Sequence, residues 1–126
     1  MSESISWNLQ LDVQDDRLEE ARALMAEMVE ATQNEPGAVD YEWFLSADGT
    51  VCHLCEKYAD SAAALEHLGN FGANFAERFL ACFTPTSFHV YGETSDEVEE
   101  ALAAFGAVHL RPFGGFARQP VPHPIG

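Results

Sequence analysis

The sequence contains few basic residues. Lys and Arg together number six against 21 Asp and Glu, which gives a formal net charge of −15. Six scattered cations cannot form a stripe that follows phosphates, so we expect neither nucleic acid nor an anionic membrane surface as a partner. Solubility is the favoured interpretation of this acidity.

Cysteine is also scarce. The odd set of Cys52, Cys55 and Cys82 does not suggest a disulfide framework, and a reducing cytoplasm is the predicted location. Cys52 and Cys55 have the spacing of a zinc or redox pair, but on a strand their side chains point to opposite faces. Buried apolar thiols are the favoured interpretation.

Long apolar runs and glycine-rich loops are missing. No segment approaches the roughly 20 apolar residues of a membrane span, and residues 1–6 lack the features of a signal peptide. No phosphate-binding glycine loop or Gly-x-Ser-x-Gly motif occurs. The 126 residues and 47% apolar content instead fit one domain, predicted over residues 1–118, with a flexible proline-rich tail over residues 119–126.

The first half of the chain alternates between strand and helix patterns. Residues from Ile5 to Val13 alternate apolar and polar, which predicts a half-buried strand. Asp15 or Asp16, with Glu19, predicts the capped start of an amphipathic helix that ends at Asn34-Glu35-Pro36-Gly37. Two further strands, 39–45 and 51–58, are joined by an Asp-Gly turn, which is typical of a hairpin.

The second half begins with a helical region capped by Asp60 or Ser61 and extending to about Phe83. Gly69 and Gly72 are expected to divide this region into two pieces. Residues 84–86 end it, and 88–93 reads as a strand. Thr94 and Glu97 predict a capped helix to Phe105, and 107–113 is a candidate for a last strand.

This order of elements predicts an α+β fold. A β-α-β-β-α-β order is the ferredoxin-like motif, with an antiparallel sheet and both helices on one face, here followed by an α-β extension. Tyr41, Trp43 and Leu45 share one side of the second strand, while Phe44 lies on the other. Because apolar side chains occur on both sides, we expect a homodimer that packs sheet against sheet.

A possible site lies where the third strand meets the following helix. Glu56 and Tyr58 share a strand face, and His67 lies about two turns into the helix, so they can reach one pocket. Asn8 is a polar residue on the first strand. The candidate aromatic walls are Trp43, Phe71 and Phe75. Each residue also has a simpler interpretation: His67 as a core-edge histidine, Asn8 as solvated, and the aromatics as core.

The chain resembles the antibiotic biosynthesis monooxygenase family of dimeric α+β barrels over roughly residues 5–93. The resemblance depends on Glu35-Pro36-Gly37, on Glu56-Lys57-Tyr58-Ala59-Asp60, and on Ala63 with His67 four residues later. Tyr58 stands where the family most often has Trp. The resemblance implies oxygenation of an electron-rich aromatic, such as a phenol, anthrone or quinol, by molecular oxygen without metal or flavin.

The implied roles are His67 as base or proton shuttle, with Tyr58 and Asn8 as hydrogen-bond donors. Substrate contacts are assigned to Trp43, Phe71, Glu56 and Phe75. Haem-cleaving relatives of this fold use an additional histidine further along the helix, which residues 74–78 do not offer. A non-catalytic small-molecule-binding dimer, or another chemistry such as isomerisation, decarboxylation or dismutation, stays open because a fold does not fix a function.

Overall fold

The computed structural model describes residues 3–118, and within that range the chain forms five strands and four helices. The predicted tail, residues 119–126, lies outside the described part. The strands are β1 (Ile5–Val13), β2 (Ala38–Leu45), β3 (Val51–Tyr58), β4 (Phe83–Tyr91) and β5 (Val108–Leu110). The helices are α1 (Leu18–Gln33), α2 (Ser61–Asn74), α3 (Ala76–Cys82) and α4 (Asp96–Ala103).

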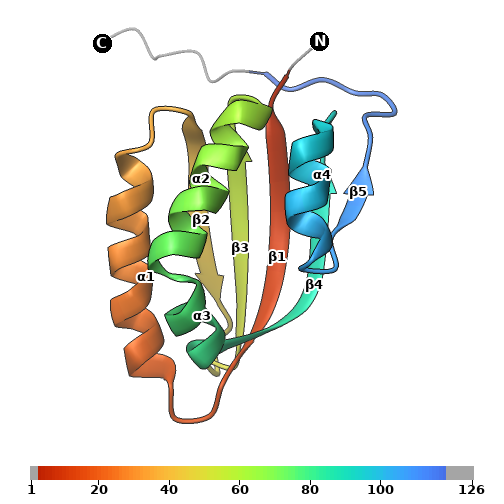
Figure 1. Ribbon diagram of the computed structural model, residues 1–126. Helices are drawn as coiled ribbons and strands as arrows, with labels where there is room; N and C mark the ends of the chain where they lie inside the picture. Colours follow the sequence, from red (N-terminus) through yellow and green to blue (C-terminus); the bar gives the residue numbers. More distant parts are fainter. Residues whose placement is uncertain (1–2, 119–126) are drawn as a thin grey trace, which may run out of the picture.

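The strands form one sheet in the order β2-β3-β1-β4-β5. Neighbouring strands are antiparallel except for the added pair β4 and β5, which is parallel. All helices lie on one face of the sheet (Figure 1). The predicted ferredoxin-like α+β fold with an α-β extension is confirmed.

Alternation along β1 explains its central place. Ile5, Trp7 and Leu11 are buried under the helices, with at most 3% of each surface exposed. Trp7 pairs directly with Glu56 of β3 on one side and with Val90 of β4 on the other. Because side chains alternate between faces, these three residues point to the same, helix-covered side.

The helix-covered side contains two apolar clusters. One lies beside α1 and α3 and includes Leu11, Leu24, Met28 and Phe79. The other lies under α2 and α4, and its buried members are Ile5, Trp7, Tyr58, Ala64, Phe88, Val90, Val98 and Leu102. Partly buried Leu9 packs against both clusters. The two clusters are therefore joined through Leu9 at strand β1, and they are separate between the sheet and the helices.

Two of the predicted helix starts are wrong. Helix α1 follows Arg17, which makes no capping hydrogen bond with its side chain, and Asp16 has a left-handed φ of 62°. This turn removes Asp16 from the geometry that an N-cap requires. Helix α4 is capped by Ser95 rather than Thr94, whose hydroxyl bonds Glu99 instead. The predicted cap of α2 by Asp60 is confirmed.

The second helical region breaks at Phe75, not at its glycines. Gly69 and Gly72 lie within the continuous helix α2, with open space beside them. Strand β4 starts earlier than predicted, at Phe83, and includes Pro85, which pairs with Leu11 next to a register shift that skips Thr86 of β4. A bulge tolerates proline because the missing N–H costs no ladder bond there. Strand β5 spans only Val108–Leu110.

The second face of the sheet carries no helix (Figure 1). Strand pairing puts several half-exposed apolar side chains on this open face. They are Phe44 (52% exposed), Val51 (37%), Tyr91 (42%), Val108 (51%) and Leu110 (43%). Within residues 3–118, no helix is long and apolar enough to cross a membrane.

Gly37 sets the distance between the α1–β2 turn and the start of α2. A Cβ atom at position 37 would overlap the Cβ of Ala63, and the carbonyl of Gly37 accepts a hydrogen bond from the amide of Ala59. The absence of a side chain at residue 37 thus allows the turn and the helix to touch. This contact brings Glu35, two residues earlier, close to the face of α2.

We predict that Gly37→Ala lowers the free energy of unfolding by about 1–3 kcal/mol, because backbone must move to relieve the overlap. Urea unfolding measures the change. Gly69→Ala is the matched control, since it lies in a helix with open space and should gain up to about 1 kcal/mol. Equal stability of the Gly37→Ala protein and the wild type would contradict the packing described.

Candidate functional site

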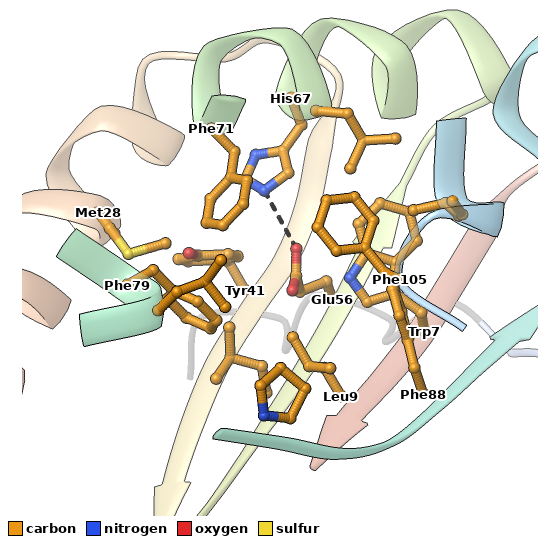
Figure 2. A pocket seen from close by; sticks show the side chains of 15 residues that line it. Trp7, Leu9, Met28, Tyr41, Glu56, His67, Phe71, Phe79, Phe88 and Phe105 are labelled. Atoms are coloured by element: carbon orange, nitrogen blue, oxygen red, sulfur yellow. Dashed lines mark ion pairs between the residues drawn. The ribbon is translucent and has the colours of Figure 1, made fainter. Parts of the chain in front are cut away.

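A pocket lies where the two apolar clusters fail to meet, between the sheet and helices α2 and α3. Its walls are almost entirely carbon, and its volume is about 50 Å³. Figure 2 shows Phe71 and Phe79 on one side and Trp7, Phe88 and Phe105 on the other. Glu56 and His67 are the ionisable pair among the lining residues, and the hydroxyl of Tyr41 points toward Met28 in Figure 2.

His67 is held between two carboxylates. Its Nδ1 lies 3.0 Å from Glu35 Oε1, and its Nε2 lies 3.2 Å from Glu56 Oε1. The three side chains are at most 8% exposed. Each ring nitrogen faces an oxygen that accepts hydrogen bonds, which favours the imidazolium form with both nitrogens donating. Burial opposes this charge, but the two glutamates outweigh it and raise the pKa of His67.

Glu56 divides its two oxygens between structure and cavity. Its Oε1 accepts from Tyr58 Oη at 2.7 Å and faces His67 Nε2. Its Oε2 makes no hydrogen bond with any of residues 3–118. In Figure 2 the second oxygen of Glu56 points into the cavity, away from the dashed ion pair with His67. One acceptor is therefore free for a ligand.

Tyr58 supports this carboxylate from within the core. It is fully buried, and its ring lies 4.9 Å from the ring of His67 and 5.0 Å from that of Trp7, between centroids. Burial, followed by the charge of Glu56, raises the pKa of Tyr58. The phenol thus stays neutral and donates a hydrogen bond to Glu56. Tyr58 acts on the pocket through Glu56 and is not itself part of the wall.

Glu35 connects this group to the outside. It follows the end of α1 and is 8% exposed. Its Oε2 accepts from Asn70 Nδ2 at 3.2 Å, and Asn70 is exposed on α2. A series of polar contacts therefore leads from the cavity to the surface of α2, through Glu56, His67, Glu35 and Asn70.

The structure brings together four of the predicted site residues: His67, Glu56, Tyr58 and Phe71. The first two and Phe71 line the pocket, and Tyr58 contacts both polar groups. The shared strand face of Glu56 and Tyr58 follows from period-two alternation, as predicted.

Asn8, Trp43 and Phe75 lie elsewhere. Asn8 points to the open face of the sheet, where its amide contacts Cys55 Sγ at 3.3 Å, so it cannot donate into this pocket. Trp43 lines a separate hollow beside α1. Phe75 sits at the α2–α3 break under the guanidinium of Arg78, 5.5 Å from its ring centre. The alternation that buried Trp7 turned Asn8 the other way.

Three contributors were missed: Glu35, Trp7 and Tyr41. Trp7 faces Glu56 across the β1–β3 ladder, and Tyr41 faces it across β2–β3. Both line the pocket. Strand register, once known, would have found these two. Glu35 carried no such signal, because its approach to His67 depends on the tertiary contact at Gly37.

The cysteines do not form a paired site. Cys52 is buried among apolar side chains, which raises the pKa of its thiol to about 11, while Cys55 points to the open face beside Asn8. Among residues 3–118, no group of three or more His, Cys, Asp or Glu is arranged to hold a metal ion. The predicted opposite orientation of Cys52 and Cys55 is confirmed.

A family model for antibiotic biosynthesis monooxygenases matches residues 5–82. No curated protein matches the chain. The matched range contains Glu35, Glu56, Tyr58 and His67 but ends before β4 and α4, which complete the pocket wall.

Solved structures share the fold. MupZ from Pseudomonas fluorescens is 25% identical, with a TM-score of 0.84 over 94% of this chain and 91% of that chain. Rv0793 from Mycobacterium tuberculosis is 26% identical, with a TM-score of 0.55 over 74% of this chain and 97% of that one. SnoaB from Streptomyces nogalater, a cofactor-independent oxygenase, is 14% identical, with a TM-score of 0.63 over 97% and 100%. At that identity the likeness to SnoaB concerns the fold alone.

The raised pKa of His67 predicts a pH-dependent stability. The charged ring stabilises the fold fully below its unfolded pKa of 6.5, and this contribution is lost as pH rises through the higher folded value. Urea unfolding from about pH 6 to about pH 9 should therefore show wild-type stability falling relative to His67→Gln. At the acid end the variant should be less stable by about 3–5 kcal/mol, because two buried carboxylates lose their partner. Parallel pH profiles for the two proteins would refute the charged state.

Proposed function

Because the chain belongs to the antibiotic biosynthesis monooxygenase family, we propose that it oxygenates an electron-rich aromatic molecule with molecular oxygen and without a cofactor. The single observation that carries the proposal is a carbon-walled pocket whose polar side presents a buried Glu56–His67 pair. Such a pocket can bind an aromatic ring, exclude water and remove a hydroxyl proton. Phenols, anthrones and quinols are the substrate classes with the required chemistry.

Within this proposal, Glu56 takes the substrate proton and His67 passes it on. Both nitrogens of His67 face carboxylates, so its ring offers no free lone pair to a ligand. The unpartnered Oε2 of Glu56 does offer a lone pair to a ligand. His67 then serves as the proton shuttle toward Glu35, and Tyr58 keeps the carboxylate in place. Asn8 has no part in this proposal, and Trp43 and Phe75 act only through packing.

The reaction balances without another reductant. The substrate O–H bond breaks as its proton moves to Glu56, and the resulting anion passes an electron to molecular oxygen. Carbon–oxygen bond formation follows, the O–O bond breaks, and one oxygen atom leaves as water. For a quinol, the product is a hydroxyquinone, and the substrate itself supplies all the electrons that the oxygen takes up. The protein contributes position, a base and a dry cavity.

Substrate entry requires side chains at the pocket mouth to move. The cavity of about 50 Å³ is smaller than the roughly 150 Å³ that holds a benzene ring. Leu80 and Phe105 line it and are 48% and 44% exposed. Solvent lies on their other side, so both can swing outward. We therefore expect single-ring substrates to be accepted most readily.

We infer that the open face of the sheet is covered by a second copy of the chain. Phe44, Val51, Tyr91, Val108 and Leu110 expose apolar surface there. Polar side chains of the central strand β1 lie between these apolar groups, and such a mixed surface fits an isologous interface better than a core. The dimer and the cytoplasmic location stay predictions from the sequence.

Oxygen consumption tests the activity. With an electrode and a panel of hydroquinones, phenols and anthrones, we expect uptake above buffer for at least one hydroxyaromatic. For that substrate, Glu56→Gln should lower kcat by about 100-fold or more, the range expected for loss of a general base. His67→Gln should lower kcat less, since Oε2 of Glu56 remains.

The matched control is Glu66→Gln, on the exposed surface of α2. It makes the same chemical change outside the pocket and should leave uptake unchanged. Binding without uptake across the whole panel would favour the non-catalytic alternative. Full oxygen uptake by the Glu56→Gln protein would contradict the assignment of Glu56 as the base but not the oxygenase activity itself.

Light scattering tests the dimer. The wild type should have twice the chain mass of 13.8 kDa. Phe44→Asp puts a charge on the open face and should shift the protein toward the monomer, because a buried unpaired charge is costly. Ala62→Asp, on the exposed side of α2, is the control and should keep the dimer. A wild-type monomer at all concentrations would rule out this interface.

A further inference from the structure

On the side of Glu56, away from the unpartnered hydroxyl of Tyr41, the pocket offers a ligand two polar atoms of opposite kind. The first is Oε2 of Glu56, which accepts hydrogen bonds and has no partner among the described residues. The second is the indole N–H of Trp7, which donates. Trp7 makes ring contacts with Tyr58, His67 and Phe88, but within residues 3–118 its nitrogen makes no hydrogen bond.

The residues that carry these two atoms lie side by side. Trp7 and Glu56 are direct partners in the antiparallel ladder between β1 and β3. Side chains of such a pair start about 5 Å apart and point to the same face of the sheet. Figure 2 shows the indole nitrogen turned toward the cavity, on the side where Glu56 stands. A small polar group in the cavity can therefore meet both.

We propose, building on the proposed function, that this pair recognises the hydroxyl of a neutral aromatic molecule. The hydroxyl donates to Oε2 of Glu56 and accepts from the indole N–H of Trp7. A hydroxyl is the smallest group that can do both. The rest of the molecule lies against the carbon walls formed by Leu9, Phe71, Phe79 and Phe88.

Charge excludes the acidic relatives of such a ligand. Two carboxylates around one imidazolium leave a net negative charge beside the cavity. A ligand carboxylate would lie against Glu56 with its own charge unpaired in a carbon-walled space, at a high desolvation cost. Aromatic acids should therefore bind poorly, whatever the shape of their ring.

Hydrogen-bond counting disfavours an amine. An ammonium group has three donors and no acceptor, whereas the cavity presents one free acceptor at Glu56. The charge of Glu56 attracts an ammonium, but the cost of removing this cation from water offsets the attraction. Two ammonium N–H groups and the indole N–H of Trp7 would also stay unsatisfied, and each buried unsatisfied group carries a penalty. The hydroxyl leaves none of these groups without a partner.

The experiment compares single-ring ligands that differ only in this group. Dissociation constants of para-chlorophenol, para-chloroanisole, para-chlorotoluene, para-chlorobenzoate and para-chlorobenzylamine are measured on the intact wild-type protein by titration NMR. We expect the phenol to bind about 10-fold more tightly than the anisole, which can accept but not donate. The benzoate and the amine should bind more weakly than the toluene.

Two variants separate the two contacts. In Glu56→Gln, the preference for phenol over toluene should fall about 10-fold, and the benzoate should gain affinity. In Trp7→Phe, the same ratio should fall about 3-fold while the aromatic wall remains. Taking the ratio within one protein cancels changes in packing. Trp43→Phe and Glu66→Gln are the matched controls outside the pocket and should keep the wild-type ratio.

Each possible result either supports or overturns the proposed recognition by Glu56 and Trp7. Equal affinity for phenol and toluene, or tighter binding of the benzoate or the amine, overturns the proposal on the wild type alone, even if a variant fails to fold. Binding of none of the five ligands overturns it as well. Oxygen uptake without this discrimination leaves the oxygenase and removes the recognition pair. Discrimination without uptake supports the pair and removes the oxygenase.

Discussion

The buried contact of His67 with two glutamates is the constraint on which the site depends. An isolated carboxylate or imidazolium in this carbon-rich interior would be strongly disfavoured, so none of the three groups is stable there without the others. Their mutual attraction fixes the ring plane of His67 and the orientation of Glu56. It also joins three separate parts of the chain, namely the α1–β2 turn, strand β3 and helix α2. The contact with the two glutamates thus sets both the position and the protonation state of His67.

The surrounding aromatics keep this interaction dry. Trp7, Tyr41 and Tyr58 each place a ring within 6.3 Å of the ring of His67, between centroids. The low dielectric that results strengthens every charge contact inside and raises the cost of leaving one unpaired. Tyr58 belongs both to the aromatic surroundings and to the charged group, because its ring packs in the core while its hydroxyl donates a hydrogen bond to Glu56. A pocket with little polar surface can thus still border a buried charged group.

Much of this arrangement could be predicted from the sequence, and there are physical reasons why the rest could not. Alternation put Glu56 and Tyr58 on one face, and helical spacing turned His67 toward them. The fold followed from the order of elements. Glu35 could not be found this way, because no period links a turn to a helix 32 residues later. The caps of α1 and α4 were misplaced because neighbouring Asp, Ser and Thr residues compete for one position, and tertiary context selects among them.

The pocket is built from two stretches of chain, one inside and one outside the range that the family model matches. Its charged group lies wholly within residues 5–82, whereas Phe88, Leu102 and Phe105 come from the portion beyond. The mouth can therefore be reshaped by substitutions in α4 and the turn after it without disturbing the buried ions. The size of molecule that the pocket admits therefore depends on Leu102 and Phe105, which lie outside the segment that holds the charged group.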